Sequence, residues 1–78
     1  KEYDTPERLI LKDEIQATIA RAIDSLPDDL KTAITLRELE GMSYEEIAQT
    51  MECPIGTVRS RIFRARDAID NMLKPLLK

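Results

Sequence analysis

The residues with the clearest potential for chemistry lie between positions 54 and 66, which read PIGTVRSRIFRAR. This stretch holds four arginines and no acid, so it carries +4; since the whole chain has a net charge of −3, the remainder carries −7. The simplest interpretation is a solvated helix face. The more specific interpretation is a surface that contacts a polyanion, because a basic stripe on an acidic body is typical of local phosphate binding.

The composition predicts a small all-α domain. The chain has 78 residues, of which 42% are hydrophobic, 35% are charged and only three are aromatic. β-branched residues are scattered, which argues against a sheet. No apolar run approaches the ~20 residues of a membrane span, so we expect no membrane insertion. The chain begins at Lys1 rather than Met, so we expect it to be a piece of a longer protein.

The side chains that usually perform catalysis or bind metals are scarce. The chain has no histidine and one cysteine, Cys53, which rules out a disulfide framework and a zinc site built from His and Cys. Its many carboxylates lack a histidine or nucleophile to work with, so we expect no enzyme, metal or cofactor. A small domain without disulfides fits the reducing cytoplasm.

Four helices should position the arginines. Thr5 as N-cap with Pro6 at the first position predicts a first helix to about residue 26, in which Ile15, Ile19 and Ala22 begin an apolar face. Pro27 ends this helix and opens a second, in which the apolar positions are Leu30, Ala33, Ile34, Leu36 and Leu39. Gly41 supplies a left-handed stop.

The last two helices predict a helix-turn-helix. Ser43 and Glu46 form a capping box before a short third helix, and Pro54 breaks the chain before a fourth helix from Ile55 towards Leu73. Apolar residues of this fourth helix recur within about 60° of Val58 at 100° per residue. A short capped helix, a turn of about three residues and a longer helix is the arrangement used to enter the DNA major groove, and no winged elements are expected.

Side-chain directions divide the fourth helix into roles. Ile55, Gly56 and Thr57 lie at its positive end, where free backbone N–H groups can bind a phosphate. The residues expected to point outward, where base edges would lie, are Arg59, Ser60, Phe63 and Arg64. Arg66 lies close to the apolar stripe and is expected to pair with an acid. Arg61 fits a phosphate contact and an ordinary surface position equally well.

Residues 26–66 resemble region 4 of bacterial extracytoplasmic-function sigma factors, particularly the sigma-E type. The motifs are LP at 26–27, LRELEGMSYEEIA at 36–48 and PIGTVRSRIFRAR at 54–66. The resemblance implies a single domain over 1–78, cut from a longer sigma factor, whose first helix at 1–26 follows an interdomain linker. One departure is Glu52, at a turn position where many members have glycine; a left-handed Glu52 costs about 1–2 kcal/mol.

The resemblance also implies a function. Such domains bind the promoter −35 element, here GGAAC-like, dock on the β-flap of RNA polymerase, serve the envelope stress response and can be covered by an anti-sigma factor. The implied base contacts are Arg59, Ser60, Phe63 and Arg64. The implied phosphate contacts are Arg37, Ser43, Tyr44, Ile55, Gly56 and Thr57, to which we add Arg61.

Two other functions remain open from the sequence. A LuxR-like regulator shares the helix-turn-helix but usually acts as a dimer on a palindromic site. A protein-binding helical adaptor would instead use the arginines to contact an acidic protein and the apolar residues of the first two helices as its main contact surface.

Overall fold

The computed structural model describes residues 6–76, with side chains from residue 11 onward. It contains α1 (Pro6–Ser25), α2 (Asp28–Glu38), α3 (Tyr44–Met51), α4 (Ile55–Leu73) and a short 3-10 helix, η1 (Lys74–Leu76). The expected N-cap, Thr5, lies outside the described residues. Within residues 6–76 there is no strand, and the prediction of an all-α fold with four main helices is confirmed.

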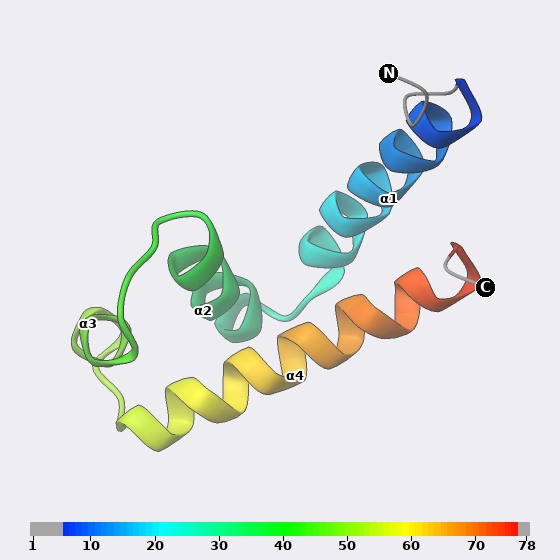
Figure 1. Cartoon of the computed structure of the whole chain (residues 1–78). Helices are drawn as coiled ribbons and strands as arrows, with labels where there is room; N and C mark the ends of the chain where they lie inside the picture. The colour runs from blue at the N-terminus through cyan, green and yellow to red at the C-terminus, as the bar shows by residue number, and fades with distance from the viewer. Residues whose placement is uncertain (1–5, 77–78) are drawn as a thin grey trace.

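The helix α4 runs along the long axis of an elongated molecule measuring 46 × 24 × 17 Å (Figure 1). Helices α2 and α3 pack against its first half, and α1 packs antiparallel against its second half (Figure 1). The helices α1, α2 and α3 therefore all pack against α4, and the N-terminal end of α4 lies beside α3.

The core lies where α2, α3 and α4 meet. Its buried side chains are Leu26, Ala33, Ile34, Ile47, Val58, Ile62 and Ala65. The three residues from α4 recur at spacings of four and three, which confirms the predicted stripe around Val58. The stripe becomes less buried towards the end of α4, where Ile69 is half-buried and Met72 is exposed.

Local signals set the helix boundaries as predicted. Pro27 and Pro54 are the N-caps of α2 and α4. At the start of α3, the Glu46 N–H donates to Ser43 Oγ at 3.1 Å, and the Ser43 N–H donates to Glu46 Oε1 at 2.8 Å. This capping box satisfies two N–H groups that the helix itself cannot, and it fixes the point at which α3 begins.

The end of α2 differs in one respect from the expectation. Gly41 adopts the predicted left-handed conformation, with φ +70°, and the next N–H, of Met42, donates to the Leu36 carbonyl at 3.1 Å. Leu39, however, is 73% exposed rather than part of the buried face. Leu39 still has helical backbone angles and donates its N–H to the Thr35 carbonyl, but at 100° per residue it lies about 180° from Leu30, on the side of α2 that faces away from the core.

Glu52, which ends α3, is the one described non-glycine residue with positive φ, at 55°. A left-handed conformation costs a residue with a Cβ about 1–2 kcal/mol, and glycine avoids this cost. The unfolded chain is more flexible with glycine, which offsets part of the gain in stability. We therefore expect Glu52→Gly to raise the melting temperature by about 4–8 °C, for roughly 1 kcal/mol. Thermal unfolding followed by circular dichroism tests this, and an unchanged or lower midpoint would contradict it.

Candidate nucleic-acid interface

The turn between α3 and α4 is short and held by backbone hydrogen bonds. The Cys53 N–H donates to the Ala48 carbonyl at 3.0 Å, and the Glu52 N–H donates to the Gln49 carbonyl at 3.3 Å. Ile47 of α3 and Val58 of α4 are both fully buried, so the two helices share one core. This geometry is the predicted helix-turn-helix, and it leaves the first turns of α4 at one end of the molecule (Figure 1).

Fewer backbone N–H groups are free at the N-terminus of α4 than the sequence suggested. The Thr57 N–H donates to the Pro54 carbonyl at 3.0 Å, so the expectation that this N–H is free is wrong. The N–H groups of Ile55 and Gly56 precede the first hydrogen bond of the helix and point out of its end. A Cβ at Gly56 would meet no protein atom within 4 Å, so the protein's own packing does not require glycine there.

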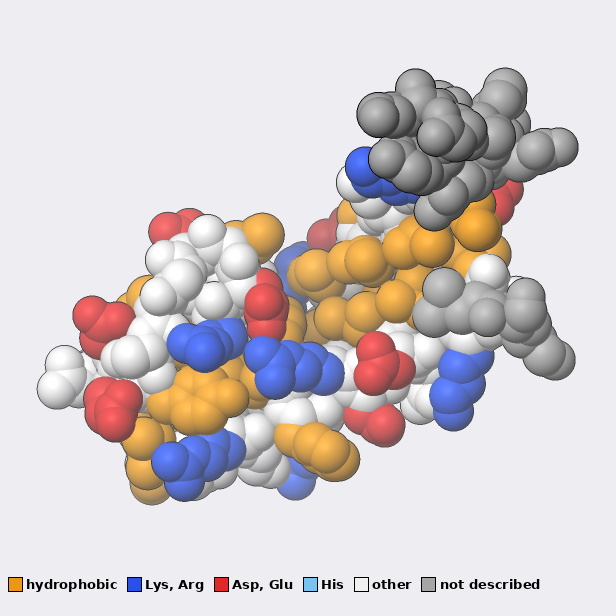
Figure 2. All heavy atoms as spheres, viewed as in Figure 1, with side chains coloured by type: hydrophobic (Ala, Val, Ile, Leu, Met, Phe, Trp, Pro, Cys, Tyr) orange, Lys and Arg blue, Asp and Glu red, His pale blue; other side chains and the backbone are white. Residues whose placement is uncertain are grey.

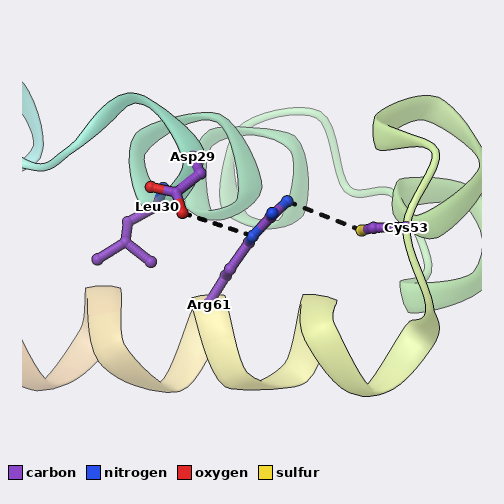
Figure 3. Close-up of polar contacts among 4 residues, drawn as sticks. All are labelled: Asp29, Leu30, Cys53 and Arg61. Carbon is purple, nitrogen blue, oxygen red and sulfur yellow. Dashed lines mark hydrogen bonds and ion pairs between the residues drawn. The ribbon is translucent and has the colours of Figure 1, made fainter.

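Two of the four arginines have partners inside the protein. The Arg61 side chain is only 24% exposed, and its Nε lies 3.6 Å from Asp29 Oδ2. Its Nη1 donates to Cys53 Sγ at 3.7 Å, so Arg61 links the start of α2 to the turn (Figure 3). The phosphate contact predicted for Arg61 stays a prediction, but the guanidinium would have to leave Asp29 to make it.

Arg66 pairs with an acid as predicted, and the acid is Glu38 at the end of α2. Its Nη2 lies 2.5 Å from Glu38 Oε2, and both side chains are half exposed. The hydrogen bond with Glu38 raises the pKa of Arg66 above its usual value, with smaller contributions from Tyr44. Because an exposed pair contributes only about 0–1 kcal/mol, its main effect is to neutralise the Arg66 charge locally.

Arg59 and Arg64 remain without a carboxylate partner in the part of the chain that the structure describes. Both are exposed, and so is Phe63, at 71%, whereas Ser60 is half-buried. The outward direction predicted for Phe63 is therefore confirmed. Base contacts by these residues stay predictions. Phe63 and Arg64 are exposed, whereas the Arg59 guanidinium lies over the Tyr44 ring.

Two of the remaining expected phosphate contacts, Arg37 and Tyr44, form a cluster with Arg59. The Arg37 guanidinium donates from Nη1 to the Met42 carbonyl at 2.9 Å, and its Cζ lies 5.0 Å from the centre of the Tyr44 ring. The Arg59 Cζ lies 5.9 Å from the same ring centre. Sequence spacing does not reveal this cluster, because its members come from α2, α3 and α4. Ser43 uses its hydroxyl oxygen as an acceptor in the capping box.

Figure 2 shows the resulting distribution of charge: basic side chains surround an apolar patch at the end where α2, α3 and the start of α4 meet. A second apolar surface lies between α1, α2 and α4, where a groove of about 300 Å³ is lined by Ile19, Ile23, Ile34, Leu39 and Ile69, among others. The ion pair of Arg66 with Glu38 lies on the wall of this groove.

Two further findings concern residues 6–76 only. Their helices include none with the length and apolar character needed to cross a membrane. Nor do the described side chains bring together three or more His, Cys, Asp or Glu residues in a group that could hold a metal ion.

Known proteins are similar in sequence to this chain. Residues 16–69 match the family described as Sigma-70, region 4. Over all 78 residues the chain is 63% identical to the RNA polymerase sigma-H factor of Pseudomonas aeruginosa, of which it covers 40%. It is 62% identical to the ECF RNA polymerase sigma-E factors of Escherichia coli and Salmonella typhi, covering 41% of each. The chain thus spans about two fifths of the length of these curated relatives.

Proposed function

Because this chain belongs to the sigma-70 region 4 family, we propose that it binds duplex promoter DNA by placing the first turns of α4 in the major groove. The observation that carries the proposal is the grouping at one end of α4 of three features: two arginines that pair with no carboxylate among the described side chains, an exposed Phe63 and an open Gly56. The packing of the domain does not require this combination, whereas binding in a groove flanked by phosphates would use all of it.

Base recognition falls to the outward residues of α4. An arginine can donate two hydrogen bonds to guanine O6 and N7, which is worth about 1–3 kcal/mol of discrimination. Arg64 is free to do so, and the exposed Phe63 ring beside it suits apolar contact with a thymine methyl group. A GGAAC-like −35 element, the sequence implied by the resemblance, offers guanines to the arginine and, on its complementary strand, thymines to the ring.

Phosphate contacts fix the register of the helix on DNA. The Ile55 and Gly56 N–H groups point out of the positive end of α4, and no side chain at position 56 holds a phosphate away. The Thr57 hydroxyl can add a further hydrogen bond. These contacts carry no sequence information but place Arg64 at the correct depth.

In the cell, we propose that the domain acts in the cytoplasm as part of a longer sigma factor, together with RNA polymerase. The names of the relatives describe RNA polymerase sigma factors and support this role. Docking on the polymerase β-flap, inhibition by an anti-sigma factor and a role in the envelope stress response are finer proposals that rest on the resemblance. The proposed function has no catalytic step and uses no cofactor.

Fluorescence anisotropy with labelled duplexes tests DNA binding directly. One duplex would carry a GGAAC-like element and the other the same bases scrambled, both at low salt. We expect the protein to prefer the first duplex, and Arg64→Ala to reduce that preference by about tenfold or more. Thermal unfolding of the variant would show whether it remains folded.

The other outcomes favour other functions. Absence of binding to either duplex would contradict the proposal and support the protein-binding adaptor. Binding as a dimer to a palindromic site alone would support a LuxR-like regulator, although the family match argues against that alternative.

A further inference from the structure

Arg61 lies on the flank of α4 that faces α2. At 100° per residue, its side chain leaves the helix about 60° from the buried Val58 and about 160° from the outward Phe63. It points towards the start of α2, where its Nε lies 3.6 Å from Asp29 Oδ2 (Figure 3). Arg61 is half-buried, whereas the other three arginines of α4 are exposed. Its environment is therefore internal, although its charge belongs to the basic segment at 54–66.

The carboxylate that meets Arg61 is itself held in place. Asp29 is the second residue of α2, and its Oδ1 accepts a hydrogen bond from the Leu30 N–H at 2.9 Å. The positive end of the α2 dipole also favours a carboxylate in this first turn. The other oxygen, Oδ2, faces Arg61. The ion pair thus joins α4 to a point on α2 whose direction is already fixed.

The same guanidinium contacts the turn between α3 and α4. Arg61 Nη1 donates to Cys53 Sγ at 3.7 Å (Figure 3). Because a thiol sulfur is a weak acceptor, this contact adds direction more than strength. The Cys53 backbone is fixed in turn by the hydrogen bond from its N–H to the Ala48 carbonyl of α3. One side chain of α4 therefore contacts both α2 and the segment that connects α3 to α4.

We propose that Arg61 is a positioning residue, whose contacts with Asp29 and Cys53 set the direction of the N-terminal half of α4 relative to α2 and α3. A phosphate would have to draw the guanidinium away from both partners. Arg59 and Arg64, by contrast, have no carboxylate within ion-pair distance among the described side chains. Arg61 thus supports DNA binding through orientation and not through its own charge, in contrast to the phosphate contact suggested from the sequence. The inference rests on the proposed DNA binding.

The first test compares Asp29→Asn with Asp28→Asn. Both variants remove one negative charge from the first turn of α2, but only Asp29 contacts Arg61 among the described residues. We expect Asp29→Asn to weaken binding to the GGAAC-like duplex by roughly three- to tenfold, because a smaller fraction of the protein holds the binding arrangement. Asp28→Asn should bind normally or slightly more tightly. If Asp29→Asn binds as Asp28→Asn does, or more tightly than the unmodified protein, Arg61 does not act by positioning.

Arg61→Gln separates positioning from charge. Affinity should fall by about the same factor as in Asp29→Asn, while the slope of log affinity against log salt keeps its value. Loss of a phosphate contact would instead make that slope shallower by about 0.9. Adding Asp29→Asn to Arg61→Gln should cost little more, because both changes remove the same ion pair. A shallower slope, or effects that add in full, would contradict the proposal.

Stability is kept apart from positioning by the choice of temperature. Circular dichroism identifies a temperature at which each variant is fully folded, and the anisotropy measurements are made there. If Asp29→Asn and Arg61→Gln melt earlier but bind normally when folded, Arg61 only stabilises the fold and the proposal fails.

Residual dipolar couplings of the backbone amides test the inference without DNA, because they report the orientation of one helix relative to another. In Asp29→Asn, the couplings should no longer fit the single arrangement of α2 and α4 found in the unmodified protein, whereas Asp28→Asn should still fit it. If the arrangement is unchanged in Asp29→Asn, positioning by Arg61 is wrong although DNA binding stands. If the protein binds neither duplex, the proposed function fails, and these couplings alone decide whether Arg61 positions α4.

Discussion

Replacing Ile47 by alanine is expected to lower the free energy of unfolding by about 2–5 kcal/mol. Ile47 is fully buried in α3, where it packs in the core shared with α2 and α4. The substitution removes apolar contact and leaves a cavity that neighbouring helices fill only in part. Since a domain of this size has a total stability of only a few kcal/mol, a large part of the population should unfold at 25 °C.

Urea unfolding followed by circular dichroism measures this effect. The control is Gln49→Ala, an exposed position on the same short helix, where the change should stay within about 0.5 kcal/mol. If both variants unfold at the same urea concentration, α3 does not depend on its packing against α4. The helix-turn-helix would then need another explanation for its stability.

Phe63→Asp should have the opposite profile, with little effect on stability and a large loss of DNA binding. The side chain is 71% exposed, so its removal leaves no cavity. On the proposed interface, however, the new carboxylate would face phosphates at close range. Placing like charges together in an interface costs several kcal/mol, so we expect affinity to fall by about 100-fold or more on both duplexes.

Leu39→Asp is a matched control for this prediction. Leu39 is 73% exposed, and its replacement changes the net charge by the same amount at the edge of the groove between α1, α2 and α4. Anisotropy with the GGAAC-like duplex should show near-normal binding for Leu39→Asp. Equal losses in the two variants would mean that overall charge, not the surface around Phe63, controls DNA binding.

The sequence was sufficient to predict the features that depend on interactions within one helical turn. Pro27, Pro54 and the Ser43–Glu46 capping box act on the backbone within one turn, and each marks the boundary that it predicted. The apolar spacing of α4 likewise determines which face is buried, because the period of the helix is fixed. Leu39, which is apolar but exposed, lies about 180° from Leu30 at helical spacing, opposite the buried Ala33 and Ile34, so its apolar character alone did not indicate burial.

The roles of the arginines required the structure. Arg61 meets Asp29 and Arg66 meets Glu38 across large separations in sequence, so their partners depend on how α2 crosses α4. The sequence predicted that Arg66 would find an acid but not which one. The resemblance assigned Arg37, Tyr44 and Arg59 to one DNA surface, but residue spacing did not show that both arginines lie over the Tyr44 ring, because this contact forms only after three helices have packed.

The continuity of α4 has a mechanical consequence. Its 19 residues span about 28 Å, from the turn beside α3 to the segment that packs on α1. Sharp kinks in helices nearly always occur at proline, glycine or inserted groups, and α4 contains neither proline nor glycine after Gly56. The helix is therefore a rigid spacer. If a protein bound the domain at α1, the N-terminal end of α4 would be held at a fixed distance and angle from that protein. The bound protein would therefore also determine which part of a DNA duplex this end of α4 can reach.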